Sequence, residues 1–307
     1  MDPLPRRRSH AWLGRNVLAL AAVSLLTDVA TEMTYPLLPV FLATVLGVSA
    51  TAVGAIEGAA ESTAALLKLA SGWWSDRLKR RKPLVVAGYA LASVVRPLIG
   101  LAQSAGQVLS IRVADRVGKG IRGAPRDALI ADSVDPAVRG RAFGFHRAAD
   151  HAGAVIGPLL AFGLLQGLGV ELRTLFLLTA IPGALAVVVL VLGVRERARA
   201  QPAAPGLGVT VAPESAVQRR PRPTLPTLAR TGLDRSFWAY LGVLLLFTLG
   251  NSTDAFLLLR ATDLGVPAAL IPLLWAFLHV VKSVSSTPGG ALSDRLGRKP
   301  LIVAGML

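Results

Sequence analysis

Acidic side chains recur four residues apart inside two consecutive, long apolar stretches. Asp28 and Glu32 stand in the first stretch, and Glu57 and Glu61 stand in the second. Residues four apart share one face of a helix, and the helical rise puts Asp28 about 18 Å from the start of its stretch, near a bilayer midplane. An ionisable side chain at that depth costs about 3 kcal/mol, and close carboxylates hold protons more tightly. The four residues are therefore candidates for carrying protons. The alternatives are that some of them pair with cations of the stretch 107–133 or lie in a wet outer vestibule.

The stretch 107–133 concentrates charge of both signs on one side of the predicted helix. At 100° per residue, its charged residues fall within an arc of about 140°; they are Arg112, Asp115, Arg116, Lys119, Arg122, Arg126 and Asp127. One face can thus line a water-filled cavity while the other packs. The excess of cations favours an anionic substrate, unless these cations only balance the four carboxylates. The substrate-cavity candidates are Arg112, Asp115, Arg116, Lys119, Asn251 and Asp254.

Other chemistry finds little support in the sequence. The chain has no cysteine, and no spacing of His, Asp and Glu indicates a metal site or a hydrolytic triad. Residues 118–123 match G-x-G-x-x-G, but no strand precedes them, so a dinucleotide site is rejected. We therefore expect that the protein is not an enzyme and that it binds neither a metal nor a cofactor.

Hydropathy supplies the elements that must position these residues. The chain of 307 residues is 53% hydrophobic with a mean hydropathy of +0.56. Stretches of about 20 apolar residues can span a bilayer as helices. We expect an all-α polytopic membrane protein with eight spans, at about 16–45, 51–74, 83–103, 107–133, 142–166, 174–194, 236–260 and 267–288. A ninth apolar run begins at Leu301, so we expect a longer chain.

Basic residues occur in alternate connections. Arg and Lys gather at positions 6–15, 77–82, 139–141, 195–235 and 295–299, whereas the connections between them are nearly free of positive charge. By the positive-inside rule, the N-terminus is cytoplasmic in a bacterial inner membrane. The net charge of +15 is clustered in these connections, which fits the inner surface of a membrane better than binding to nucleic acid. The predicted domains are an N-terminal six-helix bundle at 1–194, a cytoplasmic linker at 195–235 and a partial second bundle at 236–307.

The basic turn after the second span is repeated. The pattern G-x-x-S-D-R-L followed by a basic cluster begins at Gly72 and again at Gly290, 218 residues later. A repeat of this size in apolar sequence is typical of a transporter built from two related halves. The gate-motif candidates are Gly72, Asp76, Arg77, Arg80, Arg81, Gly290, Asp294, Arg295, Gly297 and Arg298.

These features together resemble the major facilitator superfamily of secondary transporters. The repeated turns resemble its signature loops, with Lys79 replacing the usual Gly that Gly297 retains. Arg116 followed by Gly120 is similar to its helix 4 motif. Gly153, Gly157 and Pro158 resemble the first part of the family's helix 5 motif, which is typical of antiporters. The Gly-Gly that usually closes this motif is absent. The resemblance implies twelve spans in a full chain and two bundles rocking around a central cavity.

We therefore expect a secondary active transporter of a small molecule that works by alternating access. Protons are the expected coupling ion, efflux by antiport is favoured, and the expected assembly is a monomer in the lipid bilayer. Two alternatives remain: a proton-independent facilitator of an organic anion, and a membrane receptor or scaffold without transport.

Overall fold

The computed structural model describes residues 12–78, 80–196, 238–243, 246, 264 and 271–306, and these residues form helices and connections without a strand. The linker expected at 195–235 lies outside the described residues except for its first two positions. Asn251 and Asp254 also lie outside them.

Each of the first six predicted spans corresponds to one helical rod whose ends lie within a few residues of the prediction. In chain order the rods are α1 (Arg15–Thr34) with η1 (Tyr35–Leu37), α2 (Leu38–Val40) and η2 (Phe41–Val45); α3 (Ala50–Ser75); α4 (Lys82–Val95) with η3 (Arg96–Leu101); α5 (Ala105–Asp132); η4 (Pro136–Val138) and α6 (Arg139–Phe162) with η5 (Gly163–Gly167); and α7 (Leu172–Leu178) with α8 (Ala180–Gly193).

The second half contributes α11 (Ile271–Leu296) and α12 (Arg298–Met306), and residues 238–243, within the predicted span 236–260, are also helical. The predicted span 267–288 was therefore too short at its C-terminal end, because the helix continues through the repeated motif to Leu296. Gly297 follows in the left-handed region, with φ of 85°, as a glycine after a helix end commonly does. The predicted loop at Gly290–Asp294 is thus the last part of a helix.

Local sequence explains several helix boundaries. The side chains of Ser49 and Ser104 accept hydrogen bonds from backbone N–H groups in the first turns of α3 and α5, as N-cap residues do. Pro36 lies in η1 and Pro97 in η3, where the missing N–H interrupts the α-helical hydrogen-bond pattern. In each of these two spans, the α-helix is therefore followed by a 3₁₀ segment that contains the proline.

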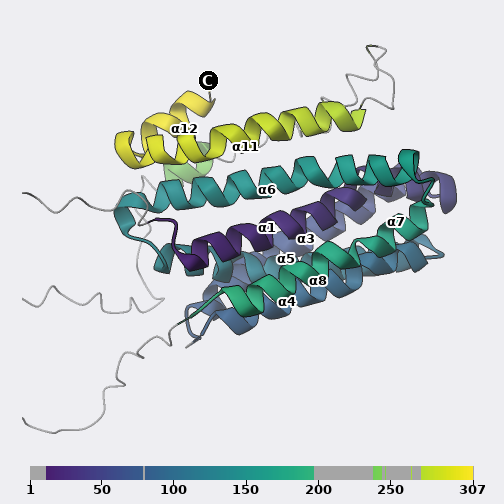
Figure 1. Cartoon of the computed structure of the whole chain (residues 1–307), viewed down its shortest axis with the longest axis horizontal. Coiled ribbons are helices and arrows are strands. Elements are labelled where there is room, and N and C mark those ends of the chain that lie inside the picture. Colours follow the sequence, from purple (N-terminus) through teal and green to yellow (C-terminus); the bar gives the residue numbers. More distant parts are fainter. Residues whose placement is uncertain are drawn as a thin grey trace, which may run out of the picture.

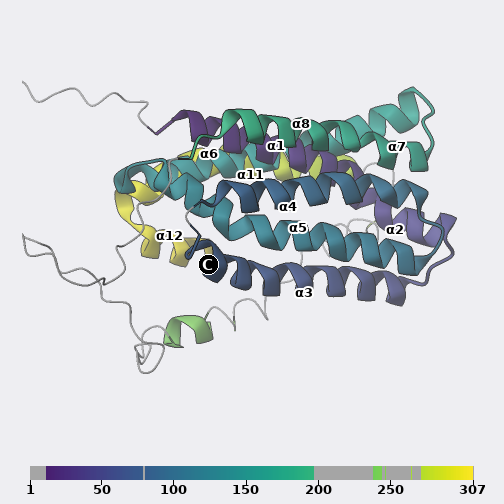
Figure 2. The ribbon, with the colours of Figure 1, turned by 90° about the horizontal axis from the view of Figure 1, so that it is seen from below.

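The rods run side by side along one axis, with α6 between α11 and α1 (Figure 1). Seen from below, α4, α5 and α3 form a second row (Figure 2). The closest pairs are α6 with α11, α1 with α6, α3 with α5, and α4 with α5, while α8 packs on α1 and α4. Two apolar core clusters stabilise the bundle, one around Leu20, Tyr89 and Leu190, the other around Phe41 and Phe176.

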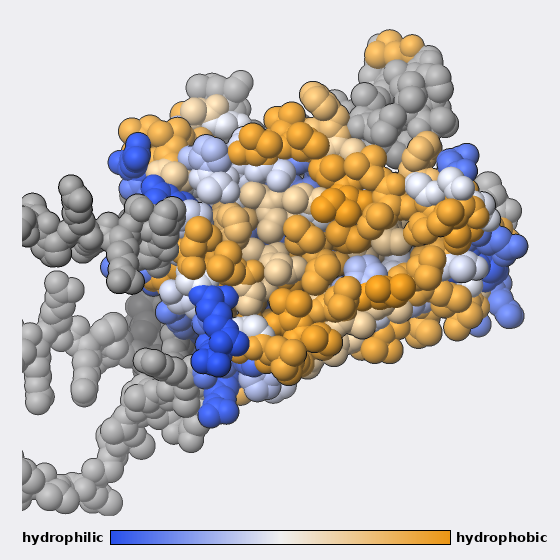
Figure 3. Space-filling model, in the orientation of Figure 1, coloured by the Kyte–Doolittle hydropathy of each residue, from blue (hydrophilic) through white to orange (hydrophobic). Residues whose placement is uncertain are grey.

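The surface fits a bilayer. On the face shown in Figure 3, hydrophobic residues cover the middle of the bundle and hydrophilic residues gather at its two ends. Four described helical rods are long and apolar enough to cross a membrane by length and composition: Arg15–Leu37, Lys82–Leu101, Pro136–Gly167 and Leu172–Gly193. Helices α3, α5 and α11 have 26, 28 and 26 residues, so they are long enough but are not among the four. The charged face of α5 explains its lower hydropathy.

Candidate functional site

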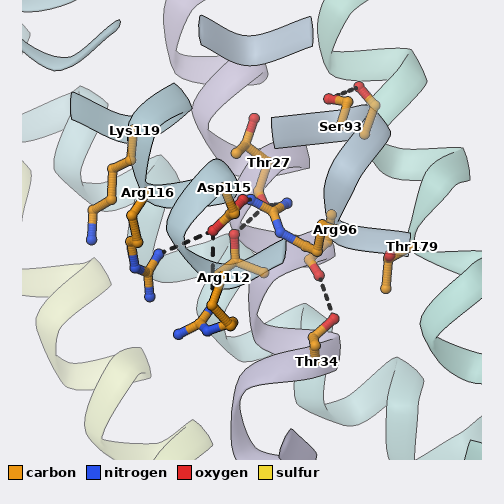
Figure 4. A network of polar contacts seen from close by, with 12 residues as sticks. Thr27, Thr34, Ser93, Arg96, Arg112, Asp115, Arg116, Lys119 and Thr179 are labelled. Atoms are coloured by element: carbon orange, nitrogen blue, oxygen red, sulfur yellow. Dashed lines mark hydrogen bonds and ion pairs between the residues drawn. The ribbon is translucent and has the colours of Figure 1, made fainter. Parts of the chain in front are cut away.

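Three arginines surround the buried carboxylate of Asp115 (Figure 4). Arg96 Nη2 lies 2.7 Å from Asp115 Oδ1, and Nη1 atoms of Arg116 and Arg112 lie 3.3 and 3.8 Å from Oδ2. All four side chains are at most 5% exposed. Asp115 therefore makes its closest ion pair with a residue of η3. The sequence alone does not reveal this pairing, because the approach of η3 to α5 is a tertiary contact.

The carboxylates of α3 pair with the cations of α5. Glu57 binds Arg112 through both oxygens, at 2.6 and 2.9 Å, and Glu61 Oε1 lies 2.9 Å from Arg116 Nε and 3.6 Å from Lys119 Nζ. Charge-assisted, bidentate contacts of this kind are strong. For Glu57 and Glu61, the structure thus contains the ion pairs that the sequence analysis gave as the alternative to carrying protons.

The carboxylates of α1 are arranged differently. Among the described residues, neither Asp28 nor Glu32 forms an ion pair within 4.0 Å, and Glu32 Oε2 is buried without a hydrogen-bond partner. The charged groups around Asp28 are Glu32 on its own helix, Asp150 on α6, and Arg122 and Arg126 on α5. A buried polar atom without a partner is unusual and marks a place where a proton, water or ligand is expected.

These side chains border a cavity of about 420 Å³ between α1, α3, α4, α5, α6 and α11. Its charged lining residues are Asp28, Glu32, Glu61, Lys68, Arg96, Arg116, Lys119, Arg122, Arg126, Arg147 and Asp150. A volume of this size is sufficient for a small organic molecule. Of the predicted cavity residues, Arg116 and Lys119 line the cavity, whereas Arg112 and Asp115 lie behind them in the buried network.

The glycines of the helix 5 motif let α6 approach α1 beside its carboxylates. A Cβ atom at Gly153 would come within 2.9 Å of Asp28 Cβ, and one at Gly157 within 3.0 Å of Glu32 Cβ. Real Cβ atoms essentially never approach a neighbour within less than 3.0 Å, and a contact of 3.0 Å is tighter than nine in ten real Cβ contacts. The motif therefore sets the distance between α6 and the two carboxylates of α1. Pro158, the third residue of the motif, lies inside the same helix.

Replacing Gly153 by alanine is expected to destabilise the protein by about 1–3 kcal/mol, since the extra methyl group overpacks the contact between α1 and α6. Glycine-to-alanine changes in helices ordinarily stabilise by up to about 1 kcal/mol, so the sign is diagnostic. Equilibrium unfolding in detergent micelles measures the free energy of unfolding. Gly163→Ala is the matched control, because nothing lies within 4 Å of its added Cβ. Equal stability of the two variants would refute the close contact.

Asp150 is a cavity residue that the sequence analysis missed. Its carboxylate accepts a hydrogen bond from Ser24 of α1, lies 3.0 Å from Arg147 and is 3.6 Å from His146 Nδ1. Asp150 lies within the predicted span 142–166, so the cost of an ionisable residue at bilayer depth was the signal that could have found it.

A pair of histidines links the two halves of the chain. His151 Nδ1 of α6 lies 3.2 Å from His279 Nδ1 of α11, and the Trp275 ring packs edge-on against His279 with 4.8 Å between ring centroids. A hydrogen bond between two Nδ1 atoms requires that one imidazole be neutral and accept it. No group of three or more potential metal ligands occurs within the described parts of the chain.

The predicted gate residues lie at one end of the bundle, called here the basic end, which carries Arg77, Arg81, Arg139, Arg141 and Arg295. Arg81 joins Asp76 at 3.0 Å to Asp132 at 2.7 Å, so the end of α3 is tied to the end of α5. Arg77 stacks on Trp73, with its Cζ 3.5 Å from the ring centroid. The remaining members are Gly72, which packs near Ala124, and Arg80, Arg295 and Arg298, which are exposed.

The second copy of the motif joins α11 to the start of α6. The two carboxylate oxygens of Asp294 accept hydrogen bonds from the backbone N–H groups of Gly140 and Arg141, at 2.7 and 2.8 Å. A carboxylate at this place satisfies unpaired N–H groups and faces the positive end of the helix dipole. Gly140 and Gly290 permit the close contact, because a Cβ at Gly290 would overlap the backbone of Gly140.

Comparison with known proteins places the chain among transporters. The Major Facilitator Superfamily family model matches residues 20–307. An uncharacterized MFS-type transporter of Methanocaldococcus jannaschii is 30% identical over 305 residues, which cover 96% of this chain and 70% of the relative. An uncharacterized protein of Mycobacterium tuberculosis is 32% identical over 298 residues, covering 97% of this chain and 69% of the relative.

Two further likenesses are more distant. Multidrug resistance protein MdtH of Escherichia coli is 30% identical over 132 residues, or 43% of this chain and 33% of that protein. The crystal structure of a bacterial homolog to the human lysosomal transporter Spinster, inward-facing and occupied, superposes with a TM-score of 0.63 at 20% identity. That alignment covers 92% of this chain, which spans 62% of the solved chain, and it supports the fold alone. The chain is a multi-pass membrane protein that belongs to the Major Facilitator Superfamily, a family of transporters and not of enzymes.

Proposed function

We propose that this protein is a proton-coupled secondary transporter of a small molecule. The observation that carries the proposal is the pair of α1 carboxylates beside the cavity: Asp28 and Glu32 lack ion pairs among the described residues, whereas Glu57 and Glu61 are neutralised by α5. An ion pair with arginine favours the charged form of a carboxylate, while a buried carboxylate without an ion pair is freer to gain and lose a proton. The structure therefore favours Asp28 and Glu32 over Glu57 and Glu61 as proton carriers.

Alternating access is the mechanism that the arrangement supports. The cavity lies between five rods of the first half, those of α1, α3, α4, α5 and α6, and α11 of the second half, and α11 reaches it through His279. The contacts of Asp294 with Gly140 and Arg141 join the two halves at the basic end. Opening the cavity toward the basic end requires that these hydrogen bonds break as the halves separate.

Orientation follows from charge. The basic end would face the cytoplasm, so the N-terminus would be cytoplasmic in the inner membrane of a bacterium. The likeness of 132 residues to a multidrug resistance protein supports export, and the helix 5 glycines favour antiport. Antiport, the gate role of the repeated motif and the monomeric state stay predictions.

The test is proton movement driven by a substrate gradient. Purified protein is reconstituted into liposomes that contain the pH dye pyranine, and a panel of membrane-impermeant anions, cations and neutral compounds is added outside. For at least one compound, we expect a change of internal pH beyond that of protein-free liposomes. Internal alkalinisation indicates antiport and acidification indicates cotransport. Substrate uptake without any proton movement would contradict the proposal.

A proton-independent facilitator of an organic anion is the second candidate. Seven of the lining residues are lysine or arginine and four are aspartate or glutamate, so the wall carries an excess of positive charge. The same liposomes distinguish the candidates, since a facilitator would accumulate radiolabelled anion to equilibrium at constant internal pH.

A further inference from the structure

Arg122 differs from the other buried arginines of the described chain. Five arginines are buried, and four of them contact a carboxylate: Arg81 with Asp132 at 2.7 Å, Arg96 with Asp115 at 2.7 Å, Arg112 with Glu57 at 2.6 Å, and Arg116 with Glu61 at 2.9 Å. Arg122 is 7% exposed, lines the cavity, and has no carboxylate within 4.0 Å among the described residues. Its Nη1 atom is buried without a hydrogen-bond partner.

An unpartnered buried guanidinium is costly. A buried charge is normally paired, and leaving it unpaired costs several kcal/mol. Two further arginines line the cavity without being fully buried, and each forms an ion pair: Arg126 with Asp127, and Arg147 with Asp150. A cation left without a partner beside a cavity is what a binding site for an anion requires before its ligand arrives.

The surroundings of Arg122 hold it in place. Its Cζ lies 4.2 Å from the centre of the Tyr89 ring, which is a cation–π contact. Gly88 allows α4 to approach the base of the side chain, since a Cβ there would come within 2.8 Å of Arg122 Cβ. A cation fixed in this way loses little entropy when it binds a ligand.

We propose that Arg122 is the anchor for the negatively charged group of the transported molecule, and that this molecule is a small organic oxyanion bearing a carboxylate or phosphate. The planar edge of a guanidinium donates two parallel hydrogen bonds to such groups. The cavity of about 420 Å³ has room for a ligand of this class. The proposal names the substrate class of the transporter proposed above and so rests on that function.

Asp28 is the acidic group that competes for Arg122. The two belong to the same charge cluster, with Arg126, Glu32 and Asp150, but they are not within ion-pair distance of each other. The guanidinium is therefore open to an oxyanion, which would add negative charge close to Asp28. This arrangement distinguishes Arg122 from Arg116, whose carboxylate partners already occupy it.

The test compares oxyanions with neutral molecules of similar shape. Thermal unfolding of the purified protein in detergent is measured with glycerol 3-phosphate against glycerol, succinate against succinamide, and gluconate against glucose, at equal ionic strength set with chloride. We expect at least one oxyanion to raise the Tm above that with its neutral counterpart. Arg122→Gln is expected to abolish this difference, whereas Arg173→Gln, whose arginine bonds to the backbone carbonyls of Gly100 and Ala102 away from the cavity, retains it.

A second measurement does not depend on folding of the variant. Phenylglyoxal modifies accessible arginines, and the effective oxyanion is expected to protect Arg122 of the wild-type protein, as read by peptide mass spectrometry. Absence of any oxyanion preference in the wild type, or the same preference in a folded Arg122→Gln variant, would overturn the proposal. Unfolded Arg122→Gln together with no protection of Arg122 would overturn it as well.

Binding in detergent needs no gradient, so the two proposals can fail separately. Oxyanion binding without proton movement in liposomes leaves the anion site standing and removes the proton-coupled function. Proton movement driven only by a cation or a neutral compound, without oxyanion binding, removes the anion site and leaves the coupled function.

Discussion

Replacing Asp28 by asparagine is expected to reduce substrate-driven proton movement to the level of protein-free liposomes. Asparagine keeps the size and hydrogen-bonding capacity of the side chain but cannot take up a proton. Asp28 lies beside the cavity with no ion pair among the described residues, and Gly153 of α6 packs directly against it. A group with these properties can change its charge state in step with the contact between the two helices.

The measurement is the pyranine signal in liposomes with the compound that gives the largest wild-type response. Uptake of the radiolabelled compound in the same preparation shows whether binding and movement of the substrate persist. Glu61→Gln is the matched control, because Glu61 is ion-paired to Arg116 and its side chain is 55% exposed. Both residues were candidates from the sequence, and the structure separates them. Full proton movement by Asp28→Asn would remove Asp28 as the coupling residue.

The sign of the coupling depends on the neighbouring cation. If an oxyanion occupies Arg122, an ionised Asp28 repels it, so protonation of Asp28 and binding of the anion favour each other. Linkage of this kind is reciprocal, and it makes the proton and the anion move in the same direction. A cationic substrate would instead compete with the proton, which gives the antiport that the helix 5 motif favours. The direction of the internal pH change thus reports the charge of the substrate.

The sequence was sufficient to predict the helical rods and the concentration of charge on α5, because both follow from local patterns of hydropathy and spacing. It was insufficient to predict which charges pair. Arg96 reaches Asp115 from η3, and Asp294 binds the first N–H groups of α6 across the interface between the halves. Such contacts depend on how helices distant in sequence are packed. Spacing on one helix therefore identified candidates but not their partners.

Tertiary packing also decides which of the four carboxylates form ion pairs. Asp28, Glu32, Glu57 and Glu61 look alike in sequence, as two pairs four residues apart in apolar helices. They differ in the structure because Glu57 and Glu61 of α3 pair with the basic face of α5, whereas Asp28 and Glu32 of α1 have no ion pair among the described residues. Burial alone therefore does not mark a proton carrier. The presence or absence of a neutralising cation is the more informative property, and only tertiary packing reveals it.

Replacing Asp115 by asparagine is expected to lower the free energy of unfolding by about 3–5 kcal/mol, the usual cost of breaking a buried ion pair by removing one partner. Asp115 is 2% exposed and is the carboxylate that pairs with Arg96, which is 3% exposed. Arg112 and Arg116 retain Glu57 and Glu61 in the variant, so the uncompensated charge is mainly that of Arg96. Equilibrium unfolding in mixed detergent micelles measures the loss.

A double-mutant cycle distinguishes loss of the ion pair from a general effect of the substitution. Arg96→Gln combined with Asp115→Asn leaves a neutral, hydrogen-bonding pair, and pairs of this kind replace buried ions at little cost. We therefore expect the double variant to be more stable than Asp115→Asn alone. Asp127→Asn is the control, since its carboxylate is 32% exposed and, in the part of the chain that the structure describes, its ion pair is with the neighbouring Arg126, which predicts a change of at most about 1 kcal/mol. If Asp115→Asn were as stable as Asp127→Asn, the network around Asp115 would contribute nothing to folding. Its contact with Arg116, which borders the cavity, would then have to be explained by transport alone.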